Sequence, residues 1–380
     1  MKFKVKGNEF SNILNTVIKG FDSKEDNSYV AFELGKDELI VTSRSRSSFF
    51  KGELKAHSIE LDPEEPTVYH VDGVKLKQLI SILPSAPVDV SFEINDSTRS
   101  FTIRTVASKY KLPVLSQTPL ASVPKVEEYI TVDANELMTV IKDLIKIVST
   151  DPSTQEHQIS CMHFNINEEL VKLSATDSYA LGSKKIECSK INLENKKDVL
   201  IRHSEVNLLS STFSTGETLT IVGSDTMFGY IDENNTLSLV GVINMEPLDT
   251  RQIEAITQKD NVVVVDKDEL KSAIEIVDKL SPKDETIDID FTEEDVLRVS
   301  NRYGDYIDVN VTEGELNSPG TASFATSVIL KAINPANNGP LRLELGDLTD
   351  GSPGVVRIVS LQADGSDDDK TSLLATRMVG

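Results

Sequence analysis

The residue types that carry out most enzyme chemistry are scattered along this chain of 380 residues. No two of its five histidines have the i, i+4 spacing of a helical zinc site. Neither a G-x-x-x-x-G-K-[ST] phosphate loop nor a G-x-G-x-x-G dinucleotide turn occurs. The acidic run Asp367-Asp368-Asp369 could bind a cation, but such runs are more often solvated hairpin tips. We therefore expect no catalytic residue, no metal site and no cofactor.

The composition is that of an ordinary soluble protein, with 39% hydrophobic and 26% charged residues, which excludes global disorder. The two cysteines, Cys161 and Cys188, cannot form a disulfide framework and fit a reducing cytoplasm. No apolar run is long enough for a membrane span, and the N-terminus lacks the apolar stretch of a signal peptide. The net charge of −22 argues against a general nucleic-acid coat, because binding phosphate requires clustered positive charge.

The elements that position the side chains follow a pattern that occurs three times. Each copy has an alternating apolar pair, a polar bridge, and then apolar residues at i, i+3, i+4 and i+7. This pattern is typical of a short strand that leads into an amphipathic helix. Asp133 and Asp266 directly precede their helices, where a carboxylate can cap backbone N–H groups. The copies begin at residues 3, 130 and 263, so the offsets are 127 and 133 residues.

Two further patterns recur in the same order: a strand that ends in small polar residues, and a strand that leads into a second helix. A β-rich stretch closes each unit. We predict an α+β fold of three tandem domains of like topology, each with two helices packed on antiparallel sheets. The predicted helices are 9–20, 73–83, 136–148, 202–213, 269–280 and 325–333, and the predicted domains are 1–126, 127–259 and 260–380.

The predicted helices carry a different charge from the rest of the chain. They hold 9 Lys+Arg against 7 Asp+Glu, whereas the remainder holds 30 against 54. The basic residues also avoid the apolar stripes: Lys142 and Lys146 lie one turn apart, opposite Leu137, Ile141 and Leu144. Lysines that merely solubilise outer faces would explain one such helix. Six repeated helices favour a common surface that leans positive.

The three repeats, the start Met1-Lys2-Phe3-x-Val5 and the segment 175–181 (Ala-Thr-Asp-Ser-Tyr-Ala-Leu) resemble the bacterial-type β sliding clamp, the DNA polymerase III beta subunit. The resemblance covers the whole chain in register. It departs at three motifs. The family has Gly-His-Arg-Leu after its Thr-Asp pair, and its aromatic-Pro-Asp segment between domains two and three becomes Glu246-Pro247-Leu248-Asp249 here. The family also ends in Met-Pro-Met-Arg-Leu where this chain ends in Ala375–Gly380. These departures suggest a diverged member, of the kind that a phage could encode.

The resemblance implies a processivity factor of DNA replication, not an enzyme. Clamps are closed rings of six such domains, so a chain of three domains implies a head-to-tail homodimer. Twelve helices spaced by about 10 Å, each with a radius of about 5 Å, leave a hole about 28 Å wide that admits duplex DNA. The implied partners are double-stranded DNA without sequence preference, the replicative polymerase, a clamp loader and a second copy of the chain. The implied location is the cytoplasm of a bacterial or phage-infected cell, with no membrane contact.

Three sets of site residues follow. The dimer contact would bring Phe101 and Ile103 of domain one against the helix end that carries Leu280 in domain three. The helix pattern, with Lys24 added from the family's loop, places DNA contacts at Lys19, Lys24, Lys75, Lys77, Lys142, Lys146, Arg202, Lys271, Lys279 and Lys331. By position in the family, a partner-peptide groove would comprise Ile159, Thr176, Tyr179, Leu181, Pro247, Arg251, Ile253, Arg377 and Met378.

Two other classes of protein remain open. One is a multi-domain nucleic-acid enzyme with an acidic metal site assembled from distant residues. The other is a repeat scaffold that binds only proteins. Ring formation without turnover separates a clamp from the enzyme, and retention that depends on duplex DNA separates it from the scaffold.

Overall fold

The structure is a computed structural model, in which contacts divide the chain into two compact units. Unit 1 comprises Met1–Leu137, Cys188–Asn195 and Ser204–Asn244, and unit 2 comprises Met138–Glu187, Lys196–His203 and Met245–Gly380. The residues of the second predicted domain are thus shared between the two units. The described residues are 2–21, 29–35, 37–60, 68–80, 83, 88–95, 97–116, 122–154, 157–167, 169–191, 196–213, 216–250, 259–281, 286–349, 354–362, 364–368 and 370–377.

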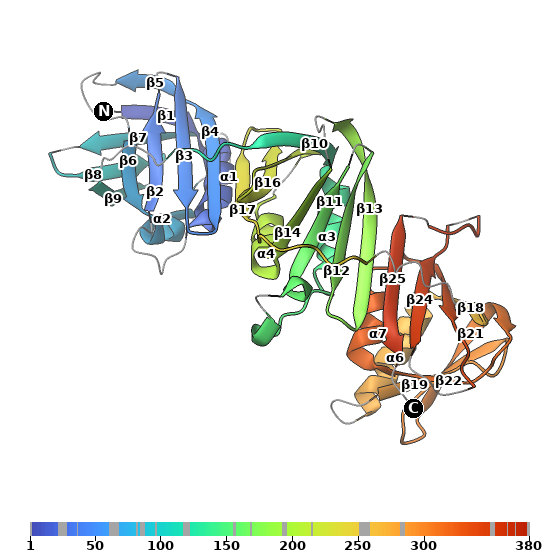
Figure 1. Cartoon of the computed structure of the whole chain (residues 1–380). Coiled ribbons are helices and arrows are strands. Elements are labelled where there is room, and N and C mark those ends of the chain that lie inside the picture. Colours follow the sequence, from blue (N-terminus) through green and yellow to red (C-terminus); the bar gives the residue numbers. More distant parts are fainter. Residues whose placement is uncertain are drawn as a thin grey trace. The chain divides into compact units, whose positions relative to one another are not determined.

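The order strand, helix, strands, helix, strands occurs three times along the chain, as predicted (Figure 1). The first copy is β1 (Lys2–Lys6), α1 (Gly7–Val17), β2 (Tyr29–Leu34), β3 (Glu38–Arg44), β4 (Ser48–Lys55), β5 (His57–Glu60), β6 (Val68–Asp72), α2 (Gly73–Leu79), β7 (Asp89–Asn95), β8 (Ser100–Arg104) and β9 (Lys109–Ser116), with a 3-10 turn at Ile18–Gly20. The second is β10 (Glu127–Asp133), α3 (Ala134–Leu144), β11 (Cys161–Ile166), β12 (Leu170–Thr176), β13 (Ala180–Ile191), β14 (Lys197–Arg202), α4 (His203–Thr212), β15 (Thr218–Gly223), β16 (Met227–Asp232) and β17 (Leu237–Gly241), with 3-10 turns at Pro152–Thr154 and Gln158–Ser160. The third is β18 (Asn261–Asp266), α6 (Lys267–Leu280), β19 (Thr286–Asp290), β20 (Val296–Ser300), β21 (Tyr306–Leu316), β22 (Thr321–Ala325), α7 (Thr326–Ile333), β23 (Pro340–Leu345), β24 (Gly354–Ser360) and β25 (Thr371–Arg377).

The helices begin where side-chain caps satisfy the first backbone N–H groups. The Asp266 carboxylate accepts hydrogen bonds from the Asp268 and Glu269 amides at 2.9 and 3.0 Å. Asp133 accepts one from the Glu136 amide at 2.7 Å, so both predicted caps are confirmed. In α6 the apolar stripe is buried as the spacing predicts: Leu270, Ala273, Ile274 and Val277.

All the strand pairings of unit 1 are antiparallel. They follow one another in the order β13 (its last residues), β10, β15, β16, β17, β4, β3, β2, β6, β9, β8, β7, β1 and β5. The pairing of β17 with β4 joins the second repeat to the first, with Leu239 opposite Phe49.

The strands of unit 2 are likewise antiparallel. They follow in the order β14, β11, β12, β13, β25, β24, β23, β18, β21, β20, β19 and β22. Here the pairing of β13 with β25 joins the second repeat to the third, with Leu181 opposite Leu374.

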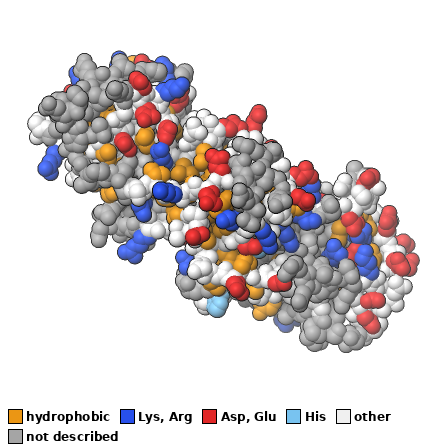
Figure 2. Space-filling model, turned by 45° about the horizontal axis from the view of Figure 1, so that its top comes forward, with side chains coloured by type: hydrophobic (Ala, Val, Ile, Leu, Met, Phe, Trp, Pro, Cys, Tyr) orange, Lys and Arg blue, Asp and Glu red, His pale blue; other side chains and the backbone are white. Residues whose placement is uncertain are grey.

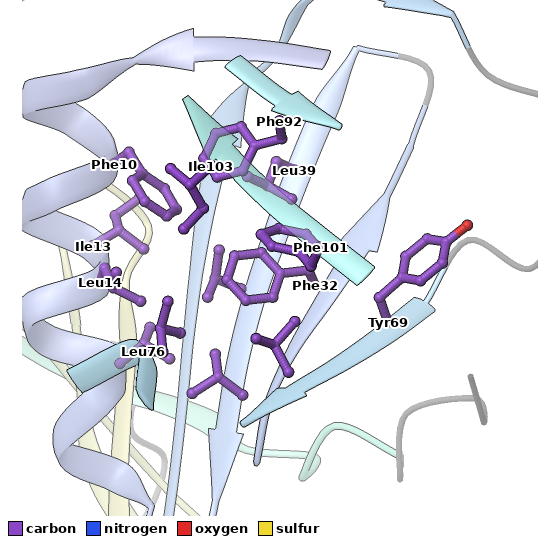
Figure 3. Packing of buried hydrophobic residues seen from close by; sticks show 14 of the residues in the cluster. Phe10, Ile13, Leu14, Phe32, Leu39, Tyr69, Leu76, Phe92, Phe101 and Ile103 are labelled. Carbon is purple, nitrogen blue, oxygen red and sulfur yellow. The ribbon is translucent and has the colours of Figure 1, made fainter. Parts of the chain in front are cut away.

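The core of unit 1 lies between α1 and the strands that it covers, and it is rich in phenylalanine (Figure 3). The rings of Phe3 and Phe92 stack with centroids 4.5 Å apart, and those of Phe32 and Phe101 lie 4.7 Å apart. Aromatic pairs at these distances add to the stabilisation from burial. Among the described residues, no helix is long and apolar enough to span a membrane.

Candidate partner-binding groove

A tight turn between β12 and β13 carries several residues of the predicted groove. The Asp177 carboxylate accepts hydrogen bonds from the amides of Tyr179 and Ala180 at 3.0 and 2.8 Å. The Thr176 hydroxyl donates to the Ala180 carbonyl at 2.8 Å and accepts from the Ser178 amide at 3.1 Å. Ser178 has a φ of 79°, in the left-handed region that non-glycine residues seldom adopt, so these side-chain bonds hold a strained turn in place.

A small cavity of about 20 Å³ lies beside this turn in unit 2. Thr176 and Leu181 line it from the turn, Cys161 and Leu200 from neighbouring strands, and Leu248 from the segment that follows β17. A cavity of this size holds about one water molecule. An apolar side chain of the size of leucine, if placed here by the expected partner peptide, would therefore have to displace one of the lining groups. Leu248 is the obvious group, because 41% of its surface is already exposed.

A larger cavity of about 280 Å³ adjoins the small one, and most of the residues that line it are polar or charged. Its lining includes the His163 imidazole, which lies 2.8 Å from the Asp198 carboxylate through Nε2. Burial lowers the pKa of His163 more than this carboxylate raises it. Burial alone would raise the pKa of Asp198, but hydrogen bonds from His163, Asn165 and Lys196 outweigh it and lower that pKa. The two cavities share His163, Ser174, Leu248 and Thr250.

The predicted groove residues are brought together only in part. Thr176 and Leu181 line the small cavity and Pro247 lines the larger one. Tyr179 is 63% exposed on the turn, and Ile159 is half-buried in the 3-10 turn Gln158–Ser160. Arg251, Ile253, Met378 and the side chain of Arg377 lie outside the described residues, although the Arg377 backbone pairs with Gly354.

Sequence reasoning missed His163, Asp198 and Leu248 as groove residues. The pairing of β11 with β14 sets His163 and Asp198 near one another, and no local motif reports a contact between residues 35 positions apart. Leu248 offered a signal, because a large apolar residue in a linker indicates a contact with the surface that the linker crosses. The linker is fastened by the Gln158 side chain, which donates to the Glu246 carbonyl at 2.9 Å.

The predicted DNA contacts differ in their surroundings. Lys75 and Lys77 on α2, Lys142 on α3, Lys146 just after it, and Lys279 on α6 are exposed. Lys271 lies 3.9 Å from Glu275 one turn along α6, and Arg202 is half-buried at the end of β14. Lys19 donates to the Ser211 carbonyl, and burial lowers its pKa. Lys331 forms an ion pair with Asp177, and Lys24 lies outside the described residues. Figure 2 shows basic and acidic side chains interspersed on the visible surface.

The predicted dimer contacts need a correction. Phe101 and Ile103 are fully buried in the core of their own unit, where they face Phe10 and Phe32 (Figure 3). Their side chains therefore have no surface to offer to a partner. Leu280, by contrast, is 58% exposed at the end of α6. Ile276, one turn earlier on the same helix, is 45% exposed.

Among the residues that the structure describes, no group of three or more His, Cys, Asp or Glu side chains could hold a metal ion.

The whole fold is similar to several solved structures. The DNA polymerase sliding clamp from Bacillus subtilis is 16% identical with a TM-score of 0.83, over 100% of this chain and 99% of that one. The DNA polymerase III subunit beta from Pseudomonas aeruginosa is 15% identical with a TM-score of 0.81, over 100% of both chains. The Helicobacter pylori beta clamp bound to a DNA ligase peptide is 18% identical with a TM-score of 0.78, also over 100% of both. No protein-family model and no curated protein matches the chain. The repeats and these similarities together confirm the prediction from the sequence: the chain has the fold of the bacterial DNA polymerase III beta sliding clamp.

Proposed function

We propose that this protein is a DNA sliding clamp, a non-catalytic processivity factor that encircles duplex DNA as a ring-shaped homodimer. In this role it tethers the replicative polymerase and other factors during DNA replication, after a clamp loader has placed it on DNA. Its location would be the cytoplasm of a bacterial or phage-infected cell. The observation that supports the ring most directly is the way in which the repeats are joined.

The two joins between repeats use strands at equivalent positions in the repeats. The first residues of β4, Ser48–Lys51, pair with β17, the last strand of the second repeat. The first residues of β13, Ala180–Lys184, pair with β25, the last strand of the third repeat. In both cases the strand that follows the central hairpin of one repeat accepts the final strand of the next. A third pair of this kind would join β21 to β9, which is the last strand of the first repeat.

Neither of these two strands has this neighbour within its own unit. Among the described residues, Tyr306–Asn310 of β21 pair only with β20, and Lys109–Leu112 of β9 pair only with β8. A strand edge with free N–H and C=O groups is a template for another chain. Two copies can satisfy both edges at once if each β9 pairs with the β21 of the other copy. This head-to-tail arrangement closes when three repeats per chain supply a pseudo-sixfold rotation.

The two edges also match in chemistry. Lys109 and Lys111 are exposed on β9, whereas Asp308 is exposed on β21 beside the exposed Tyr306. Opposite charges across two strands favour their pairing, although Asp308 also accepts two hydrogen bonds from Arg298, which offsets part of its charge. In the same repeat as β21, α6 presents exposed apolar side chains that a partner would cover. We therefore move the proposed dimer contact from Phe101 and Ile103 to β9, and retain Leu280.

Non-specific DNA contact requires cations that are weakly fixed and accessible to phosphate. The exposed Lys75, Lys77, Lys142, Lys146 and Lys279 meet this requirement, and Lys271 and Arg202 could contribute to it. The rest of the chain is acidic, which discourages DNA from binding to other surfaces.

For the partner site we propose the groove formed by the β12–β13 turn and the two adjoining cavities. The H. pylori clamp, which shares the fold, is bound to a DNA ligase peptide. We infer that this chain likewise binds a short peptide by placing an apolar side chain against Thr176 and Leu181. One or two apolar anchors give modest affinity, in the micromolar range at roughly −8 kcal/mol.

Sedimentation equilibrium at micromolar concentration, combined with electron microscopy, tests the ring. We expect a mass of two chains of 41.8 kDa and a closed ring in the images. The clamp role itself is tested by loading the protein on nicked circular duplex DNA. Linearising that DNA should release the protein, because a ring slides off an end. A one-chain mass, or equal retention on circular and linear DNA, would contradict the proposal.

A further inference from the structure

A lysine that only contacts DNA would extend from its helix into solvent. The Lys331 side chain on α7 does not. Its ammonium group forms an ion pair with the Asp177 carboxylate on the β12–β13 turn, 154 positions away in the sequence. The Lys331 side chain is 32% exposed and that of Asp177 only 9%. The ion pair therefore connects a helix of the third repeat to the turn of the second repeat that borders the groove.

Asp177 is also the acceptor that closes this turn, through the Tyr179 and Ala180 amides. Its carboxylate is nearly buried, so its negative charge requires compensation that the two amide dipoles supply only partly. Without Lys331, the carboxylate gains hydration most easily when the turn opens. Opening would release Ser178 from its left-handed conformation and displace Thr176 and Leu181 from the wall of the small cavity.

We propose that Lys331 and Asp177 are positioning residues of the partner groove. Lys331 stabilises the closed turn through its ion pair and does not serve as a contact to DNA. The inference rests on the proposed groove for its functional meaning, but its structural part can be measured without any partner. It predicts that the partner-binding surface depends on a helix residue that never touches the peptide.

The first test is amide hydrogen exchange of residues 176–181 in the full-length protein. Lys331→Met should speed exchange of the Tyr179 and Ala180 amides by about tenfold, because it strands a buried carboxylate. Asp177→Asn keeps the acceptor oxygen and removes the charge that needs compensation. We therefore expect Asp177→Asn in the Lys331→Met background to restore most of the protection, and Lys331→Arg to retain it. Unchanged exchange in Lys331→Met, or no rescue in the double variant, would overturn the proposal.

The second test distinguishes between two roles of Lys331, stabilising the turn and contacting DNA. We expect Lys331→Met to weaken binding of a DNA ligase peptide by about tenfold, with rescue by Asp177→Asn, and to leave retention on circular duplex DNA within twofold of the wild type. Lys370→Met is the matched control, since it removes a lysine of the same unit whose ion-pair partner, Glu187, is 78% exposed and not buried; it should leave both peptide binding and DNA retention unchanged. Loss of retention with unchanged peptide binding would show Lys331 to be a DNA contact. If the wild type bound no peptide but the exchange rates changed as expected, the proposed groove would be wrong. The stabilisation of the turn by Lys331 would still be supported.

Discussion

Removing the Leu280 side chain should weaken the dimer by an amount that the structure allows us to estimate. Complete burial of a leucine side chain stabilises by about 1.5–3 kcal/mol, and 58% of Leu280 is still exposed in the single chain. Covering it at an interface would thus add about 1–1.7 kcal/mol, of which Leu280→Ala removes roughly two thirds. A closed ring of two chains contains this contact twice, so the loss doubles to about 1–2 kcal/mol. The dimer Kd should rise about fivefold to thirtyfold.

Sedimentation equilibrium over a dilution series measures this change directly. Val123→Ala is the matched control, because Val123 is 43% exposed in the segment before β10 and lies on neither proposed edge. It should leave the Kd within twofold of the wild type. Thermal unfolding of both variants at low concentration should match the wild-type chain, since Leu280 contributes little to its own core. A Leu280→Ala dimer as tight as the wild type would refute the placement of α6 at the interface.

Three further predictions concern DNA, the groove and pH. Charge reversal of Lys142 and Lys146 to Glu should shorten retention on circular duplex DNA several-fold and flatten its salt dependence, as measured by dissociation at 50 and 200 mM salt; unchanged retention would move the DNA path elsewhere. Leu248→Ala should tighten peptide binding about threefold to tenfold in calorimetry, because it opens the 20 Å³ cavity; weaker binding would make Leu248 a contact instead of a barrier. Burial lowers the pKa of His70 from 6.5, so the unfolded chain takes up the proton more readily than the folded one. The resulting stability is present above about pH 6.5 and is lost as the pH falls towards the lower folded pKa. In denaturant unfolding, the free energy of unfolding of His70→Phe should therefore fall less between pH 7 and 5.5 than that of the wild type.

The repeated fold was predictable because each copy carries its own local signals. The apolar spacing from Leu270 to Val277 predicts a buried helix face, and Asp133 and Asp266 mark where two helices begin. These signals act over a few residues, so tertiary contacts do not have to be known. Three copies in the same order then predict like topology without any knowledge of how strands pair.

The site was less predictable because it depends on which face of an element is covered. Phe101 and Ile103 alternate as strand residues should, but residues on both faces of β8 are buried, so alternation could not show whether these side chains face a core or a partner. Lys19 and Lys331 avoid the apolar stripes of their helices, which is typical of solvent-facing lysines. Their hydrogen-bond partners, Ser211 and Asp177, lie more than 150 positions away and leave no local pattern.

The joins at β4–β17 and β13–β25 have a kinetic consequence that concerns covalent connectivity. Both occur between repeats of one polypeptide, so a strand that separates remains tethered and re-pairs at a high effective concentration. The proposed β9–β21 contacts have no tether once both have separated, and their re-formation then depends on protein concentration. While one contact holds, however, it tethers the other. In the proposed ring, the β9–β21 contacts would therefore be the kind of seam at which opening persists long enough for the proposed clamp loader to pass DNA through. A single opening there should close without loss of the partner.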